Sequence, residues 1–211
     1  DASIISSNGI DQFEVIKDKY FEYDSSIYKE IHSLKEKIFH IGDLEKLSNR
    51  LKDLERKITI FHAKIIKDLK IQDNEVLIGF HGQTIYHNSE EKISKQLGDG
   101  KLLNQLTSKK IIYNFRKNDI LNGGEGAPLT PIFHQLITTQ KKIKLPVCIL
   151  NIGGISNLTF IRGIKNEEIL SKDVGPGNCL INEWIQAHTN KKYDDGGKIS
   201  EIGNINEIIL E

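Results

Sequence analysis

Four side chains in this sequence could transfer protons in a reaction: His81, Asp99, Asp119 and Glu125. Asp119 stands out because it follows Arg116 by three residues and precedes the pair Gly123-Gly124 by four. Residues three apart share one face of a helical turn, so Arg116 and Asp119 would lie side by side. The pattern fits a catalytic carboxylate kept ionised by a cation, although on the residues alone a surface ion pair is the simpler interpretation.

Two glycine-rich stretches could approach an anion: Asn151-Ile152-Gly153-Gly154 and Asp173-Val174-Gly175-Pro176-Gly177-Asn178. Glycine accepts positive φ and lets a backbone N–H come close to a ligand. The second stretch precedes a helix predicted to begin near Cys179, and a helix N-terminus attracts anions. An ordinary β-hairpin and an N-capping asparagine would also explain them, and neither stretch matches the Walker or dinucleotide fingerprints.

Other kinds of catalytic site are not indicated by the residues. His81 and His87 have no third ligand near them in the sequence, so we expect no metal site. Cys148 and Cys179 form no zinc or disulfide pattern, and Cys148 lies in an apolar run that predicts a buried strand cysteine. No GxSxG motif occurs.

Composition narrows the class of protein. The 211 residues are 38% hydrophobic and 27% charged, with 29 basic and 29 acidic residues and no basic patch, which argues against nucleic acid as a partner. No apolar run approaches the length of a membrane span, and the first residues lack the features of a signal peptide. The low cysteine content favours a reducing, cytoplasmic compartment. No Met occurs, so we expect the chain to be part of a longer protein.

The elements that must position these residues alternate between strands and helices. Asn8-Gly9 predicts a hairpin between strands at 2–5 and 12–23. Apolar spacing predicts a helix over 25–39 and one long helix over 44–69, with Asp43 as its N-cap. The long stripe favours packing within its own domain, and a coiled-coil dimer remains an alternative. Further strands are expected at 76–80, 93–97 and 111–115, and helices at 101–107 and 129–139.

The second half of the chain is predicted to form a separate domain. A basic linker at 141–145 marks the boundary, so the domains would be 1–145 and 146–211. Strands are expected at 147–152 and 158–161 and around Ile169. A helix at 179–188 and a loop at 194–197 would follow, with a last helix at 205–210.

Five blocks resemble those of the anhydro-N-acetylmuramic acid kinases: GFHGQTIYH, QLGDGKLL, NFRKNDILNGGEGAPLTPIFHQL, LNIGGISNLTF and DVGPGNCLINEW. The resemblance covers about residues 1–203. It implies an α/β, actin-like (ribonuclease H-like) two-domain ATPase fold of the sugar kinase/Hsp70/actin superfamily. Both domains would be incomplete, because the family's N-terminal phosphate loop and its C-terminal adenine-binding portion lie outside this sequence.

The resemblance also implies an activity. Such an enzyme uses ATP and Mg²⁺ to open the 1,6-anhydro bond of anhydro-N-acetylmuramic acid and phosphorylate O6. The product, N-acetylmuramic acid 6-phosphate, is an intermediate of cell-wall recycling in the cytoplasm. This chain alone is expected to be inactive, and a homodimer is an open alternative. A non-catalytic actin-like sugar-binding or scaffold module is the other reading of the same residues, and the block GGEGAPLTP argues against a different sugar kinase.

Residue roles follow from the resemblance by position. Asp119 would be the general base that activates water, and Arg116 would support it. The sugar would be lined by His81, Gly82, Gln83, Gly123, Gly124, Glu125, Gly126, Ala127 and Pro128. ATP would be held by Asn151, Gly153, Gly154, Asp173, Gly175, Gly177 and Asn178. Family members commonly carry an acid where this chain has Asn114, which leaves the role of that position open.

Overall fold

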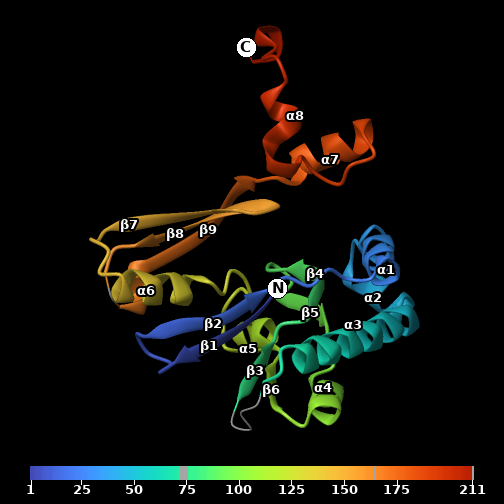
Figure 1. The fold of residues 1–211 in the computed structure, drawn as a ribbon, viewed down its shortest axis with the longest axis vertical. Helices are drawn as coiled ribbons and strands as arrows, with labels where there is room; N and C mark the ends of the chain where they lie inside the picture. The colour runs from blue at the N-terminus through green and yellow to red at the C-terminus, as the bar shows by residue number, and fades with distance from the viewer. Residues whose placement is uncertain (72–75, 164, 211) are drawn as a thin grey trace. The chain divides into compact units, whose positions relative to one another are not determined.

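The computed structural model describes residues 1–71, 76–163 and 165–210, and its contacts divide the chain into two units, Asp1–Leu129 and Thr130–Glu211. Helices and strands occur in both units, so the protein is of the mixed α/β class (Figure 1). The boundary between the two units along the chain falls just before helix α6, whereas the sequence suggested a boundary at 141–145. The assignment of residues 1–145 and 146–211 to two actin-like domains stays a prediction.

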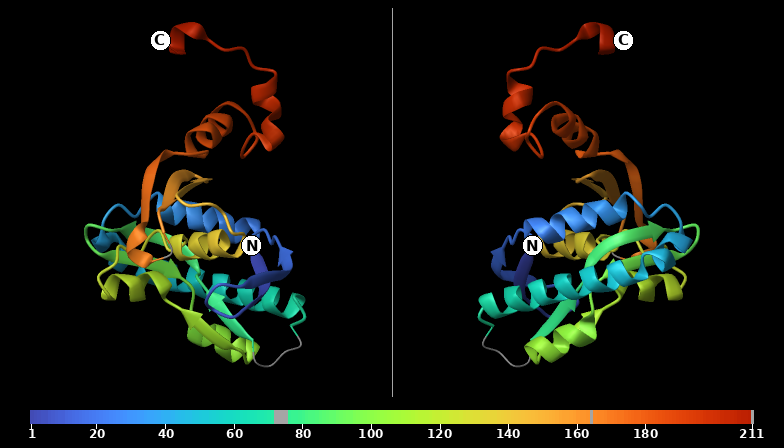
Figure 2. Two further views of the ribbon diagram at one scale, coloured as in Figure 1. Left: turned by 90° about the vertical axis from the view of Figure 1, so that its left-hand side faces the viewer. Right: turned by 90° about the vertical axis from the view of Figure 1, so that its right-hand side faces the viewer.

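The core of the first unit forms between two helices and a hairpin. Helix α1 (Ser25–Lys35) and helix α3 (Ser48–Asp68) pack together, and strands β4 (Gln83–Asn88) and β5 (Ile93–Leu97) close the cluster (Figure 1 and Figure 2). Leu34, Leu54, Ile58 and Leu97 in this cluster have no exposed surface. The apolar stripe of α3 is therefore buried within its own unit, as the spacing favoured.

The long helix predicted over 44–69 is divided in the structure. Helix α2 (Ile41–Lys46) ends at Leu47, whose φ of −97° and ψ of 9° interrupt the helix before α3 begins. Asp43 lies inside the first turn of α2, where its carboxylate accepts the N–H groups of Phe39 and His40. The hydrogen bond from Lys46, together with these two backbone bonds, lowers the pKa of Asp43 to about 2. The prediction of Asp43 as the N-cap of one helix was wrong, because the continuous apolar spacing does not reveal the break.

The strands of the first unit form three two-stranded sheets among the described residues. Strands β1 (Ala2–Ser7) and β2 (Phe13–Lys19) pair in the hairpin that Asn8-Gly9 predicted, and Oδ1 of Asn8 accepts the N–H groups of Ile10, Asp11 and Gln12. Strands β4 and β5 also pair antiparallel. Strands β3 (Leu77–Phe80) and β6 (Lys110–Tyr113) pair parallel, with helix α4 (Gly100–Thr107) between them in sequence.

The second unit is built on one antiparallel sheet of strands β7 (Val147–Ile152), β8 (Ile155–Ile161) and β9 (Ile169–Pro176). Helix α6 (Pro131–Gln140) packs on β8 and β9, and Nδ1 of His134 lies 2.9 Å from Oγ1 of the buried Thr159. The elements after the sheet are helices α7 (Cys179–His188), α8 (Lys198–Glu201) and α9 (Glu207–Leu210). Short 3₁₀ turns occur at Asn166–Glu168 and Asp195–Gly197.

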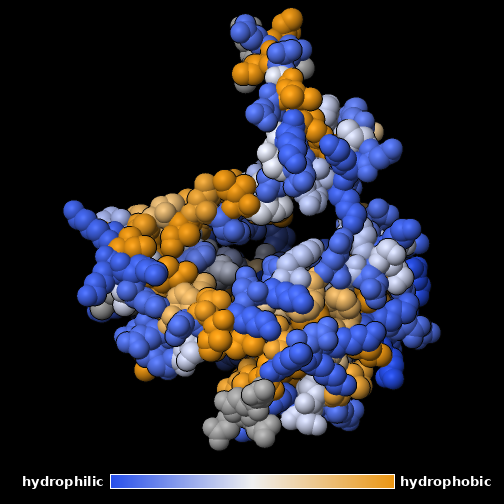
Figure 3. Space-filling model, in the orientation of Figure 1, coloured by the Kyte–Doolittle hydropathy of each residue, from blue (hydrophilic) through white to orange (hydrophobic). Residues whose placement is uncertain are grey.

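One face of this sheet is open, which overturns the expectation for Cys148. Cys148 is exposed, as are Leu150 and Ile152 on the same face of β7, because α6 covers the opposite face, where Thr159 lies. Figure 3 shows hydrophobic residues at the surface over β7. An apolar strand indicates a buried cysteine only where both faces are covered.

Helix α5 (Phe115–Leu121) completes the elements that position polar residues in the first unit.

Among residues 1–71, 76–163 and 165–210, no helix is long and apolar enough to cross a membrane.

Candidate active site

The first unit brings two polar strand ends to one edge of its parallel sheet. His81 follows the end of β3, and α5 follows the end of β6. Because these strands are parallel, their carboxyl ends lie at the same edge, where ligands commonly bind in α/β proteins. Asn114 joins β6 to α5 with a left-handed φ of 62°, a conformation that asparagine tolerates better than most residues. Asn114 therefore has a backbone role at this turn.

Arg116 and Asp119 hold the two sides of one residue in the loop that follows α5. Oδ2 of Asp119 accepts the N–H of Gly126 at 2.8 Å, and Nη1 of Arg116 donates to the carbonyl oxygen of Gly126 at 2.8 Å. The backbone oxygen of Asp119 also accepts the N–H of Gly124 at 2.9 Å. Both side chains are half-buried, and burial lowers the pKa of Arg116. The pair is a clamp on the loop rather than a surface ion pair.

The loop 123–128 needs its glycines for close approach and for backbone shape. A Cβ on Gly124 would meet the carboxylate of Asp119, and one on Gly126 would meet the side chain of Ile120. Gly123 and Gly126 have φ values of 92° and 77°, which favour glycine. Gly126 is buried, whereas Glu125 is exposed.

His81 is tied to this clamp. Its Nε2 lies 3.0 Å from Nε of Arg116, and its Nδ1 lies 2.8 Å from the carbonyl oxygen of Gly82. Gly82 has φ of 71°, and a Cβ there would meet the backbone oxygen of Leu97. The side chain of Gln83 donates to the oxygen of Thr84 at 3.3 Å. Of the residues that resemblance assigns to the sugar, His81, Gly82 and Gly126 are thus brought together around Arg116.

Helix α3 supports the loop between β5 and α4 through two side chains that had no predicted role. Oε1 of Glu55 accepts the N–H of Gly98 at 3.1 Å, and Oγ1 of the fully buried Thr59 accepts the N–H of Asp99 at 3.0 Å. These partners are about 40 residues apart in sequence. The only local signal is that Glu55 and Thr59 lie one helical turn apart.

Asp99 caps a helix, so its carboxylate has a structural role. Its Oδ1 accepts the N–H groups of Lys101 and Leu102 at 2.9 and 3.0 Å, at the start of α4. A carboxylate at this position satisfies amides that the helix leaves free.

In the second unit, the two glycine-rich stretches bind each other through their backbones. The N–H groups of Gly177 and Cys179 donate to the oxygen of Gly154 at 2.9 and 3.2 Å, and that of Asn178 donates to Gly153 at 2.7 Å. These amides at the start of α7 are therefore occupied within the protein. A Cβ on Gly177 would collide with Gly153, whereas one on Gly154 would meet nothing within 4 Å.

Two expectations for these stretches were wrong. Asp173 to Pro176 belong to strand β9 rather than to a turn, because they pair with β8 through a bulge between Ser156 and Asn157. Gly153 and Gly154 do not adopt positive φ, so glycine is not needed there for backbone shape. What Gly154 offers is an open approach to its backbone.

A polar row crosses the sheet beside this turn. Asn157 on β8 pairs with Asn151 on one side and with Asp173 on the other, which places all three on one face. Asp173 is exposed. Asn157 was not assigned a role from sequence, and only the strand register reveals it as the middle of the row.

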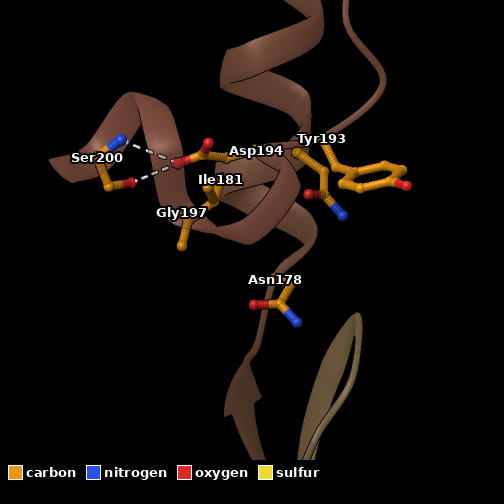
Figure 4. Close-up of a pocket in the computed structure, with 7 residues that line it drawn as sticks. Asn178, Ile181, Tyr193, Asp194, Gly197 and Ser200 are labelled. Carbon is orange, nitrogen blue, oxygen red and sulfur yellow. Dashed lines mark hydrogen bonds between the residues drawn. The ribbon is translucent and has the colours of Figure 1, made fainter. Parts of the chain in front are cut away.

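A hollow of about 400 Å³ lies beside Asn178, between α7 and α8, and Tyr193 and Ser200 also line it (Figure 4). Asp194 accepts the N–H groups of Ile199 and Ser200 and the hydroxyl of Ser200, at 2.7 to 2.9 Å. The backbone bond from Ile199 and the bonds from Ser200 lower the pKa of Asp194. This carboxylate thus holds the α8 turn rather than lying free in a loop.

The chain matches a known family along nearly its whole length. A profile described as anhydro-N-acetylmuramic acid kinase covers residues 2–211. The chain belongs to this family. An anhydro-N-acetylmuramic acid kinase of Pelagibacter ubique is 55% identical over 213 residues, which cover 100% of this chain and 56% of that protein.

More distant kinases of the same name match part of the chain. The Agrobacterium fabrum protein is 40% identical over 74% of this chain and 43% of its own length, and the Brucella canis protein is 37% identical over 78% and 46%. The chain spans about half the length of the curated relatives it matches.

In this member of the anhydro-N-acetylmuramic acid kinase family, the residues of interest form one connected group in each unit. The first joins His81, Arg116, Asp119 and Gly126 by hydrogen bonds. The second joins Gly153, Gly154, Gly177 and Asn178 through the backbone. Among the described residues, no group of three or more His, Cys, Asp or Glu side chains gathers as a metal site would require.

Proposed function

We propose that the protein acts as an ATP-dependent kinase on anhydro-N-acetylmuramic acid, giving N-acetylmuramic acid 6-phosphate for cell-wall recycling. Family membership supports the substrate class, because the family match covers residues 2–211 and one relative of this name matches the whole chain. The observation that carries the proposal is the clamp on Gly126, which holds Asp119 in a defined place at the edge of the sheet.

Asp119 is proposed as the general base. Its Oδ2 is occupied by the N–H of Gly126, and no described residue donates to Oδ1. Oδ1 is therefore the atom that can take a proton from water. Neutral water is a poor nucleophile, and a positioned carboxylate removes its proton as the new bond forms.

The water oxygen bonds to the anomeric carbon as Oδ1 of Asp119 takes one of its protons, and the bond from that carbon to O6 breaks. O6 takes the γ-phosphoryl group of ATP, ADP leaves, and Asp119 releases the proton to solvent. Arg116 keeps the loop in place. We assign the sugar to the surface formed by His81, Gly82 and Gln83 and by the loop 123–128.

ATP is proposed to approach the second unit at Gly154, whose Cβ position is open. The amides of residues 177–179 are satisfied by Gly153 and Gly154, so we give them the role of shaping the turn rather than of binding phosphate. Mg²⁺ is held mainly by phosphate oxygens and water, with one or two carboxylates. The exposed Asp173, in the polar row with Asn151 and Asn157, fits such a role.

We also propose the actin-like two-domain fold and a cytoplasmic location, since ATP is the phosphoryl donor. A homodimer remains a hypothesis to which we assign no residues.

The experiment that tests the function uses the full-length parent protein. Purified enzyme is mixed with anhydro-N-acetylmuramic acid and ATP·Mg²⁺, and the 6-phosphate product is followed by mass spectrometry, with Asp119→Asn as the comparison. The expected result is a product that carries one oxygen from ¹⁸O-labelled water at the anomeric carbon. Tight sugar binding with no product would instead favour a non-catalytic sugar-binding module.

A further inference from the structure

Both ring nitrogens of His81 are engaged, and their partners differ in kind. The carbonyl oxygen of Gly82, 2.8 Å from Nδ1, can only accept a hydrogen bond. Nε of Arg116, 3.0 Å from Nε2, can only donate one. The one ring state that satisfies both partners is neutral, with the proton on Nδ1 and a lone pair on Nε2.

The backbone sets this arrangement in advance. Gly82 takes φ of 71°, and its Cα side lies so close to Leu97 that a Cβ would not fit. A Cβ on Gly98 would likewise meet the ring of Phe80 and the Cα of Gly82. The carbonyl of Gly82 is therefore held in a crowded turn, and the His81 ring follows it.

Arg116 connects His81 to the loop 123–128 through hydrogen bonds. Nε binds His81, while Nη1 binds the oxygen of Gly126, whose N–H binds Asp119. The guanidinium is half-buried, and the partners found for it among the described residues are these neutral acceptors rather than a carboxylate. A protonated His81 would place an N–H and a positive charge against it, which would break the link.

We infer that His81 is a positioning residue that works in the neutral Nδ1–H tautomer, fixing Arg116 and through it the Gly126 peptide that holds Asp119. This inference rests on the proposed function and deepens it, because it removes His81 from the groups that could activate water. The lone pair of Nε2 is already used by Arg116. Proton abstraction therefore falls to Oδ1 of Asp119.

Two substitutions of His81 in the full-length parent protein separate positioning from base catalysis. In His81→Gln the amide oxygen can reach the place of Nε2 and accept from Arg116, whereas in His81→Asn the shorter side chain can replace only Nδ1. If His81 positions Arg116, kcat should fall about fivefold in His81→Gln, and tenfold or more in His81→Asn, roughly the worth of one hydrogen bond to a charged group. KM for ATP should stay unchanged in both. An equal loss of about 10²–10⁴-fold in both variants would make His81 the base and overturn the inference.

A spectroscopic measurement tests the same point without activity. In the ¹⁵N-histidine-labelled parent protein, long-range ¹H–¹⁵N spectra should show His81 protonated at Nδ1 and unprotonated at Nε2. Arg116→Lys should shift the Nε2 signal, and the control Arg56→Lys on the exposed face of α3 should not. A proton on Nε2, or a signal unmoved by Arg116→Lys, would refute the positioning role. If the spectrum matches but no anhydro-sugar is phosphorylated, the proposed function fails while the His81 assignment stands.

Discussion

The loop 123–128 and the turn at Gly153-Gly154 look alike as sequences, since each contains a glycine pair followed within a few residues by an apolar segment. In the first, the missing Cβ atoms are needed by the protein itself, because Asp119 and Ile120 occupy their space. In the second, Gly154 faces open space and adopts no positive φ. The difference teaches that a glycine required by its own fold and a glycine that leaves room for a ligand cannot be told apart by composition.

The largest effect should come from Asp119, whose Oδ2 binds the loop while Oδ1 has no donor among the described residues. Asp119→Asn keeps an acceptor for Gly126 but cannot take a proton, so turnover should fall by about 10²–10⁴-fold in the full-length enzyme. Sugar affinity by calorimetry and melting temperature should change little. Near-normal turnover would reduce Asp119 to a loop-holding residue and leave Glu125 as the carboxylate to test.

The free energy of unfolding should respond differently to alanine substitutions at Gly126, in the loop 123–128, and at Gly154, in the turn at Gly153-Gly154. Gly126→Ala forces a Cβ into Ile120 at a φ of 77°, so the free energy of unfolding should fall by about 1–3 kcal/mol. Gly154→Ala, the matched control, should change it by less than about 0.5 kcal/mol. Chemical unfolding of both variants provides the test, and equal losses would abolish the distinction between the regions.

A substitution at Gly154 should instead affect ligand binding rather than stability. Gly154→Val fills the open side of the turn, so ATP affinity should weaken by about 10- to 100-fold, as expected when one or two bonds to phosphate are lost. Sugar binding and the melting temperature should be preserved. If calorimetry shows that both ligands bind less well, the turn has a folding role and the proposed ATP approach is wrong.

The smallest effect should be on the pH dependence of stability, for which each unit contributes one half-buried histidine. Burial lowers the pKa of His62, packed near Tyr23 and Phe80, and of His134, beside Thr159. Since the unfolded chain takes up protons near pH 6.5 and the folded protein does so only at lower pH, stability is full above 6.5 and declines as pH falls below it.

Urea midpoints at pH 7.5 and 5.5 measure this decline. His134→Gln should reduce the difference between the two midpoints, because it removes one of the two histidines whose pKa is lowered by burial. A midpoint that rises on acidification would contradict the assignment of lowered pKa values to His62 and His134.

Most elements were predictable because their signals are local. The hairpin at Asn8-Gly9, the start of α7 at Cys179 and Pro131 in the first turn of α6 depend on residues close in sequence. The errors arose where distant pairing prevailed. Asp173–Pro176 reads as a turn until β8 pairs with it, and Cys148 reads as buried until the sheet proves covered on one face only.

The candidate site was predicted in part. Arg116 and Asp119 were placed on one helical turn correctly, because that relation needs only the helix period. Their shared partner, the peptide of Gly126, lies in the following loop, and its bonds depend on how the loop folds back. The support of Gly98 by Glu55 was invisible because about 40 residues separate the partners.

The sequence by itself determined the family, the order of most strands and helices, and the residue types able to do the chemistry. Each of these depends on residues that lie close together in the sequence. Only the tertiary structure decided that Asp99 caps a helix, that His81 has both nitrogens engaged, and that Gly154 is open while Gly177 is closed. A hydrogen bond or a steric contact depends on where two atoms lie in space. Residues distant in sequence reach those places only when the chain has folded.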